Sequence, residues 1–284
     1  MDRFVRTFAM AVAAMCLSVA AEAAIITVPQ SALIPSTQYY TDIIGGGIGD
    51  IVVMTGGGNA PGIGLASGRN DDGFSGPINF NFTTPLSFFG TPRTSFFANN
   101  NGNITFNAGL SEFVPAGPTG ANLPIISPFF GDVDTRNVSS GVLHLRTDIP
   151  NQVILTWDQV GFFEEHAPPT NSFQLVLRGP DYDIPEGEGA IGFFYKGMGW
   201  ESADLTDVSA VGFGDGLGNG EVIEGSLEPG LNQALANHHI WFDPNLNPVP
   251  PDGSTGVPFP GTLVLLGAGL LAVGATMLLR RCAQ

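Results

Sequence analysis

Two aspartates separated by one residue, Asp132 and Asp134, are the side chains of this sequence best suited to bind a metal ion. In an extended strand, both carboxylates would point to the same face. Carboxylates held this close repel one another unless a cation, an arginine or a proton intervenes. Calcium would suit the pair because it accepts several oxygen ligands in irregular loops. Arg136 would lie on the same face of the strand as the two aspartates. It therefore offers the competing explanation, a bidentate ion pair with a carboxylate.

A second candidate calcium ligand is Asp215, which opens the segment DGLGNGE at residues 215–221. Oxygen-bearing side chains and glycines are interspersed there, but the 12-residue spacing and terminal glutamate of an EF-hand loop are missing. Asn and Gly tolerate positive φ, so a hairpin turn explains the same residues. The sequence therefore requires no cofactor, and calcium at Asp132, Asp134 and Asp215 is the hypothesis to test against ion pairs and turns.

Glu164, Glu165 and His166 are the residues that would suggest a hydrolase. Glycosidases need two carboxylates several ångströms apart, on opposite sides of the sugar. Neighbouring residues in a strand point to opposite faces and would not form that pair. Neither a Gly-x-Ser-x-Gly elbow nor a His-Glu-x-x-His motif occurs in the sequence. We therefore predict a protein that is not an enzyme, with these residues on an exposed loop.

Four aromatic residues allow two interpretations. Trp157, Trp200, Trp241 and Tyr195 could stack on the sugar rings of a surface polysaccharide. At strand positions, such residues more often pack in the core. The sequence leaves both alternatives open.

The elements that must position these residues are predicted to be strands. Short runs with period-two alternation recur between turn signals, which predicts an all-β domain, an antiparallel sandwich or a barrel-like fold. At residues 172–178, Phe173 and Leu175 would face the core, while Gln174 and Arg178 would face water. The other predicted strands are residues 78–82, 94–98, 103–106, 142–146, 153–157, 190–196, 208–213 and 239–242, and one short helix is predicted at residues 231–237.

Segments of biased composition flank this β region. Residues 24–70 contain a Gly-rich stretch, which we interpret as a flexible lead-in or an irregular edge. Gly-rich phosphate loops need a strand before and a helix after, and no helix is predicted here. Residues 243–256 are rich in Pro, Asn, Asp and Gly, a composition typical of an extended spacer.

Between these flanks, a series of motifs occurs in a recognisable order. The most specific are DDGFSG at 71–76, FANNNGNITF at 97–106, PIISPFFGDVDTR at 124–136, NSFQLVL at 171–177 and VGFGDG at 211–216. In this order they resemble the nidogen-like extracellular domain, over about residues 71–242. The resemblance implies an all-β extracellular module linked with cell–matrix adhesion. It implies no catalytic residues.

The N-terminus has the features of a secretory signal peptide. A positively charged start precedes an apolar core at residues 8–20. Ala21 and Ala23 then provide a small-x-small cleavage site, so the mature chain is predicted to begin at Ala24.

The C-terminus carries a second apolar segment. Residues 263–279 are uncharged and about long enough to cross a bilayer as a helix. Arg280 and Arg281 follow, and such basic residues tend to remain in the cytoplasm. A short Pro-containing motif precedes the helix, formed by Val257, Pro258, Phe259 and Pro260. This arrangement resembles the PEP-CTERM sorting tail of Gram-negative bacteria, which implies recognition and cleavage by a membrane-embedded exosortase.

Charge and cysteine content limit the function further. The chain has 26 acidic and 10 basic residues. Its exported portion keeps 24 acidic and 6 basic residues, a net charge of −18, once both termini are set aside with Asp2, Glu22, Arg3, Arg6, Arg280 and Arg281. This charge excludes phosphate-driven nucleic-acid binding as a default. Both cysteines lie in the terminal segments, so no disulfide staples the domain.

Together these features predict an exported, surface-sorted bacterial protein that acts by binding in cell–matrix adhesion or in the organisation of an extracellular polysaccharide matrix. Its expected partners are an exosortase-type membrane protease and matrix or polysaccharide. The C-terminal helix would hold it transiently in the inner membrane before it reaches the cell surface or matrix. The alternatives are an extracellular carbohydrate-active enzyme and a passive matrix filler without a specific ligand.

Overall fold

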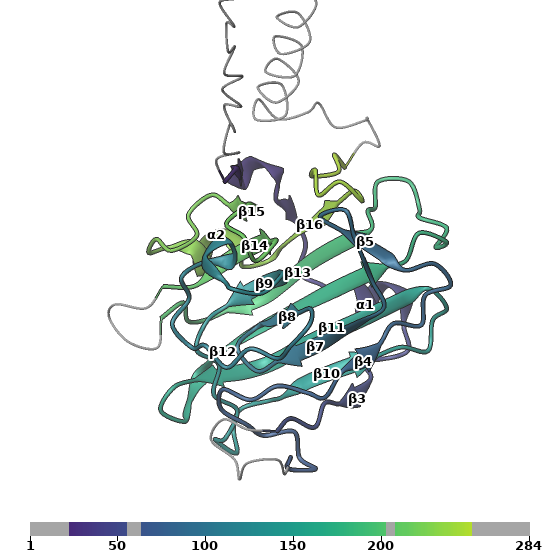
Figure 1. Cartoon of the computed structure of the whole chain (residues 1–284). Helices are drawn as coiled ribbons and strands as arrows, with labels where there is room; N and C mark the ends of the chain where they lie inside the picture. Colours follow the sequence, from purple (N-terminus) through teal and green to yellow (C-terminus); the bar gives the residue numbers. More distant parts are fainter. Residues whose placement is uncertain (1–22, 56–63, 203–207, 252–284) are drawn as a thin grey trace, which may run out of the picture.

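The computed structural model describes residues 23–55, 64–202 and 208–251. Within these ranges the fold is mostly β, with two seven-stranded sheets, a separate hairpin and a few short helices (Figure 1). The predicted signal cleavage residue Ala21, the sorting motif and the helix at 263–279 lie outside the described residues. None of the helices within them is long and apolar enough to cross a membrane.

The first sheet has the strand order β1-β15-β14-β9-β8-β7-β4. Its pairs are antiparallel except β1 with β15, which run parallel. The strands are β1 (Ile25–Val28), β4 (Ile78–Asn79), β7 (Ser95–Asn99), β8 (Asn103–Thr105), β9 (Ile125–Phe130), β14 (Ala210–Gly214) and β15 (Gly220–Ile223).

The second sheet has the order β2-β16-β13-β12-β11-β10-β3, with all pairs antiparallel. Its strands are β2 (Ile34–Pro35), β3 (Asp50–Ile51), β10 (Leu143–Arg146), β11 (Gln152–Phe162), β12 (His166–Arg178), β13 (Ile191–Met198) and β16 (His238–Phe242). The remaining elements are the hairpin β5 (Leu86–Phe88) and β6 (Thr91–Arg93), the helices α1 (Tyr40–Ile44) and α2 (Leu231–Leu235), and 3-10 turns at Gln30–Ala32 and Pro118–Gly120.

Aromatic side chains from both sheets form one core. Phe129 of β9 and Phe173 of β12 have ring centroids 5.4 Å apart, and Phe193 of β13 lies 5.3 Å from Phe213 of β14. Trp157 of β11 stacks on Phe173 at 5.1 Å. These contacts join the two sheets, so the prediction of a mostly β fold is confirmed, and the predicted helix near residue 231 is present as α2.

The outer face of β12 differs from the prediction. Phe173 and Leu175 face the core as expected, but Gln174 and Arg178 are buried instead of facing water. Residues around α1 cover them: the amide of Gln174 hydrogen-bonds to Thr41, and Arg178 donates a hydrogen bond to the Tyr40 hydroxyl, 2.7 Å away. A polar residue in a period-two strand is thus buried where another segment provides its partners.

Both predicted flanking segments take part in the fold. Residues 24–70 contribute β1, β2 and β3, so the sandwich begins well before Asp71. On the other side, the predicted spacer folds back as far as residue 251. The amide of Val249 donates to the carbonyl of Trp241, and Leu246 is only 6% exposed in the main core. Apolar side chains scattered in a Pro-rich segment are sufficient to dock it.

Candidate functional site

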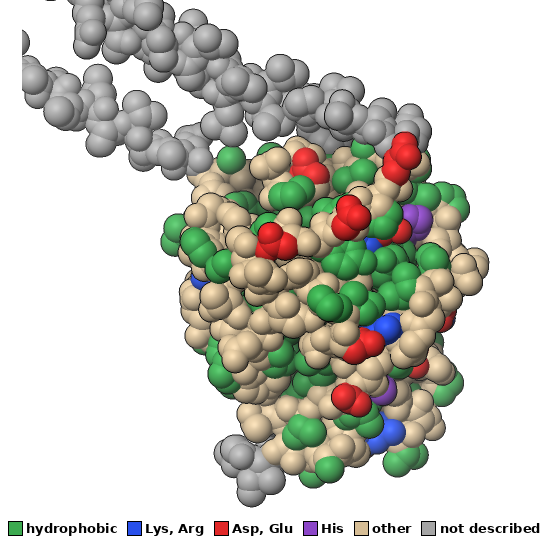
Figure 2. Space-filling model, turned by 90° about the vertical axis from the view of Figure 1, so that its right-hand side faces the viewer, with side chains coloured by type: hydrophobic (Ala, Val, Ile, Leu, Met, Phe, Trp, Pro, Cys, Tyr) green, Lys and Arg blue, Asp and Glu red, His purple; other side chains and the backbone are tan. Residues whose placement is uncertain are grey.

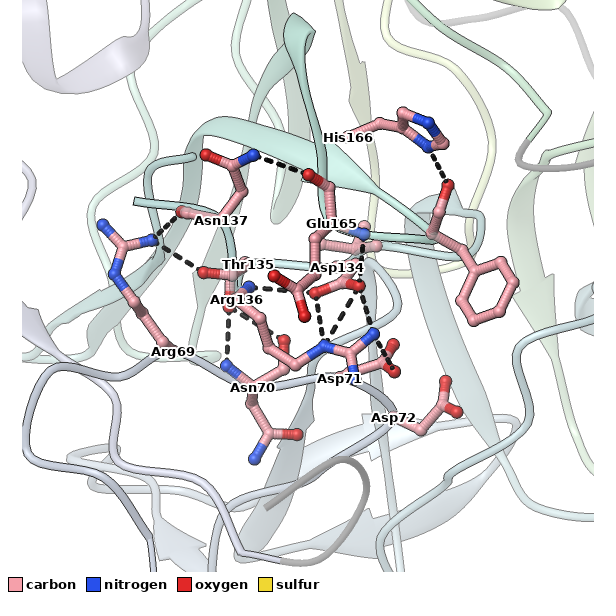
Figure 3. Close-up of polar contacts among 12 residues, drawn as sticks. Arg69, Asn70, Asp71, Asp72, Asp134, Thr135, Arg136, Asn137, Glu165 and His166 are labelled. Carbon is pink, nitrogen blue, oxygen red and sulfur yellow. Dashed lines mark hydrogen bonds and ion pairs between the residues drawn. The ribbon is translucent and has the colours of Figure 1, made fainter. Parts of the chain in front are cut away.

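Acidic side chains converge from two segments about sixty residues apart. Asp71 and Asp72 lie in the loop that leads to β4, and Asp132 and Asp134 follow the end of β9. An isolated antiparallel bridge joins the backbones of Asp71 and Asp134. Figure 3 shows Asp71, Asp72 and Asp134 around the guanidinium of Arg136. We call Asp71, Asp72, Asp132 and Asp134 the acidic cluster.

Asp134 belongs to an ion pair. Its side chain is completely buried, and its Oδ1 and Oδ2 accept hydrogen bonds from Nε of Arg136 at 3.0 and 3.1 Å. Nη2 of Arg136 lies 2.5 Å from Oδ2 of Asp134 and 2.9 Å from Oδ2 of Asp71. The backbone amide of Glu165 also donates to Asp134. The arrangement is therefore the alternative that the sequence offered, a bidentate arginine partner.

The other three members of the cluster lie near one another. Asp71, Asp72 and Asp132 each offer one carboxylate oxygen, and these three oxygens lie within 4.8 Å of one another. Asp71 and Asp132 are buried and Asp72 is half-buried. Oδ1 of Asp72 accepts a hydrogen bond of 2.8 Å from the side-chain amide of Asn101. Three hard oxygen donors in this arrangement suit a divalent cation.

Burial and mutual repulsion disfavour the charged form of these carboxyls. Burial, followed by the charges of Asp134 and Asp72, raises the pKa of Asp71 to about 7, although Arg136 opposes the shift. Burial also raises the pKa of Asp72, against the effects of Asn101 and Arg136. At Asp71 and Asp72, the guanidinium of Arg136 therefore lowers the pKa by less than burial and the neighbouring carboxylates raise it.

An asparagine-rich turn between β7 and β8 supports the cluster. Oδ1 of Asn101 accepts a hydrogen bond from the Val133 amide at 3.0 Å, and the side-chain amide of Asn100 donates to the Val133 carbonyl. Trp157 fixes the turn from the core by donating to the Asn100 carbonyl at 3.0 Å. Gly102 closes the turn with φ of 75°, where a Cβ would lie 1.7 Å from a carbonyl oxygen of β9. The NNNG motif therefore sets the backbone between Asp132 and Asp134.

A second support for the acidic cluster comes from Arg69, which lies two residues before Asp71 in the sequence. Its guanidinium donates hydrogen bonds to the carbonyls of Thr135 and Asn137, at 2.7 and 2.5 Å (Figure 3). It also donates to the carbonyl of Ser140 at 2.9 Å. These bonds hold the loop that follows Asp134 against the segment that carries Asp71.

Asp215 lies apart from the acidic cluster and has a structural role. Its carboxylate accepts hydrogen bonds from the amides of Leu217 and Asn219, at 2.7 and 3.0 Å. The side chain of Asn219 also donates to it, and the Asp215 amide donates to the Asn219 carbonyl. These bonds form the β14–β15 turn, which is the alternative that the sequence offered.

The residues considered for catalysis lie at the β11–β12 turn. Glu164 and Glu165 lie in the turn and are exposed, as predicted, whereas His166 is exposed but begins strand β12. The ring of His166 stacks on Phe162 and its Nδ1 lies 2.7 Å from the carbonyl of Phe163. The backbone amide of Glu165 donates to Asp134, and the charge of its carboxylate also acts on Asp71 and Arg136.

The aromatic residues considered for sugar stacking are packed inside the domain. Trp157 and Tyr195 are fully buried, and Trp200 and Trp241 are 4% and 2% exposed. Each therefore has the core role that the sequence left open, and none offers a face to a polysaccharide.

The predicted processing sites fall mostly outside the described residues. Val257, Pro258, Phe259, Pro260, Arg280 and Arg281 lie there. Ala23 and Ala24 begin the described part, where the Ala24 amide donates to Asn219 at 2.8 Å.

The sequence interpretation missed Asp71 and Asp72 as members of the acidic cluster. Both stand in the DDGFSG motif, which the resemblance singled out but to which no chemistry was assigned. Their proximity to Asp132 depends on the bridge between segments that are distant in the chain. On the face that Figure 2 presents, acidic side chains are scattered, with a few basic ones among them.

The fold and the cluster define a class of protein: a two-sheet β domain without disulfides whose most distinctive polar feature is a buried group of carboxylates. The family model described as "NIDO related" matches residues 54–249. The chain therefore belongs to the NIDO-related family, and the matched range includes every member of the acidic cluster.

The curated relatives alpha-tectorin of two organisms match less than half of this chain. Alpha-tectorin of Gallus gallus is 29% identical over 157 residues, which is 46% of this chain and 7% of that protein. Alpha-tectorin of Mus musculus is 29% identical over 133 residues, 38% of this chain and 6% of that protein. No solved structure matches the chain. The similarity thus concerns one domain of much longer proteins.

Proposed function

We propose that this chain is an exported bacterial protein whose NIDO-related domain acts by binding, in cell–matrix adhesion or in the organisation of an extracellular polysaccharide matrix. The observation that carries the proposal is the family match over residues 54–249, together with the similarity of part of the chain to alpha-tectorin. A secretory signal ahead of the domain supports an extracellular location.

The proposal includes sorting through the C-terminal tail. Residues 257–284 combine a Pro-containing motif, an apolar helix and two terminal arginines. In the proposed route, the helix holds the chain in the inner membrane until an exosortase-type protease cuts near the motif. The domain then reaches the cell surface or the matrix.

We further propose that the domain binds its partner without catalysing a reaction. Glu164 and Glu165, the residues that resemble a catalytic pair in sequence, lie at an exposed turn. Their positions support this proposal because a glycosidase holds its two carboxylates on either side of a bound sugar.

The test of sorting is the intact mass and C-terminal sequence of the protein from its native host. A variant carrying Pro258→Ala and Pro260→Ala is compared with a control carrying Pro250→Ala and Pro251→Ala, which changes two prolines outside the motif. The natural chain and the control should end near residues 257–261 and occur in the surface or matrix fraction. The motif variant should keep Gln284 and remain in the membrane. A natural chain that still ends at Gln284 would show an ordinary membrane anchor and contradict the sorting proposal.

The test of binding is titration of the recovered protein against the purified extracellular polysaccharide of the host, at physiological salt. Saturable binding is expected. A passive filler would show no saturation, and release of shortened sugars during the titration would favour the enzyme alternative.

A further inference from the structure

We infer that Asp71, Asp72 and Asp132 form a binding site for one divalent cation, and that Ca²⁺ is the ion that fits it best. The site joins the loop before β4 to the end of β9. The inference does not depend on the proposed adhesive function, because it follows from the geometry of the carboxylates alone.

The first argument is charge. Three carboxylates, those of Asp71, Asp72 and Asp134, lie around one guanidinium, that of Arg136. Arg136 directs its hydrogen bonds to Asp134 and to one oxygen of Asp71. Buried charges require a partner, because their desolvation is costly. A divalent cation would neutralise most of the remaining charge.

The second argument is an oxygen without a hydrogen bond. The Asp71 side chain is 91% buried, since only 9% of its surface is exposed. Its Oδ2 pairs with Arg136, whereas its Oδ1 is buried and accepts no hydrogen bond from the described residues. Oδ1 is therefore the oxygen that Asp71 can offer to the site, beside the carboxyl of Asp72 (Figure 3). A buried, unsatisfied acceptor next to two more carboxylates points to a ligand.

The third argument is size. The three ligand oxygens lie within 4.8 Å of one another. Ca²⁺ binds oxygen at about 2.3–2.6 Å, so oxygens on opposite sides of the ion are about 4.6–5.2 Å apart. Mg²⁺ binds at about 2.0–2.1 Å, demands regular octahedral geometry and gives up its waters reluctantly. A set of protein carboxylates on irregular backbone therefore favours Ca²⁺.

The experiment is calorimetric titration of the full chain, solubilised in detergent and freed of metal with EGTA, with CaCl₂ and separately with MgCl₂. The main variant is Asp72→Asn, which keeps the Oδ1 that accepts from Asn101 but removes the charge. Asp132→Asn is the second variant. Asp183→Asn, on an exposed loop, is the matched control. Thermal unfolding with and without Ca²⁺ accompanies each titration.

The expected result is one Ca²⁺ per chain, with weaker binding of Mg²⁺. At free Ca²⁺ a hundredfold above its Kd, the ratio of folded to unfolded protein should rise about a hundredfold. Asp72→Asn and Asp132→Asn should each weaken Ca²⁺ binding at least tenfold, and Asp183→Asn should not change it. In EGTA, Asp72→Asn should unfold at the natural temperature or above, because it removes a repelling charge.

Two outcomes would overturn the inference. One is that titration of the natural chain with CaCl₂ gives no saturable heat of binding and that Ca²⁺ does not shift its unfolding temperature. This measurement uses the natural chain alone and does not depend on whether a variant folds. The other is Ca²⁺ binding of equal affinity in Asp72→Asn and Asp183→Asn, which would place the ion elsewhere. Neither outcome bears on the polysaccharide titration, so the cation site and the proposed function fail independently.

Discussion

The ion pair between Arg136 and Asp134 provides the sharpest test of the acidic cluster. The change is Arg136→Gln, which removes the cation but keeps a polar side chain. Asp134 would remain fully buried with its backbone hydrogen bonds, and Asp71 would lose the partner of its Oδ2. The expected result is a large loss of folding stability measured without divalent ions.

The magnitude follows from the burial of the two partners. Removing one member of a buried ion pair costs about 3–5 kcal/mol, because the other charge is left uncompensated. Arg136 is 29% exposed, so water already screens part of its interaction, whereas Asp134 is not exposed at all. We therefore expect a loss near the lower limit, about 3 kcal/mol, or roughly a hundredfold or more in the ratio of folded to unfolded protein.

The assay is urea unfolding of the natural chain and the variant, in EGTA, with the denaturant slope compared between them. Asp148→Asn is the control, because it breaks the Arg146–Asp148 pair, in which Asp148 is 64% exposed. That exposed pair should contribute less than about 1 kcal/mol. If Arg136→Gln costs no more than Asp148→Asn, the reasoning that Arg136 compensates buried carboxylates is refuted.

Three further predictions concern the core, a turn and pH. Phe173→Ala should cost about 3–5 kcal/mol in urea unfolding, because it opens a cavity between the sheets; a cost under about 1 kcal/mol would contradict the packing of this core. Gly102→Ala should strongly lower the free energy of unfolding in the same assay, because the φ of Gly102 is 75° and a Cβ there would meet a carbonyl of β9. Gly197→Ala is the control and should have little effect, because open space surrounds that position. Equal effects of the two changes would contradict the close packing described for the turn at Gly102. Burial, followed by the charge of Asp243, raises the pKa of Glu221 to about 8, so stability should fall as pH rises from about 4.5 to about 8. In Glu221→Gln, the free energy of unfolding should decrease less with pH across this range, as measured by unfolding curves at several pH values. An unchanged pH dependence in the variant would contradict the assignment of this effect to Glu221.

The sequence predicted those strands that have one polar face or clear turn signals. Alternation at residues 172–178 located the centre of β12, and its hairpin partner β11 was expected at 153–157. β9 was not predicted as a strand, because all six of its residues are buried and no alternation exists to detect. One face of β9 meets the main core, and Leu110 packs against Ile125 and Phe130 on the other. A strand buried on both faces has no period-two signal.

The candidate site was predicted only in part. Asp132 was singled out for its chemistry, but its expected partner Asp134 pairs with Arg136, two residues along the chain. Asp71 and Asp72 come from a segment about sixty residues earlier, and only the fold shows that they lie beside Asp132. Local spacing can predict a salt bridge within one loop, whereas it contains no information on which loops meet.

The parallel pairing of β1 with β15 and the docking of residues 243–251 bring both limits of the described domain to one end of the sandwich (Figure 1). A domain whose entry and exit points lie together can be inserted into a longer chain without stretching its host. This modular geometry suits a unit that matches only 7% of the length of alpha-tectorin.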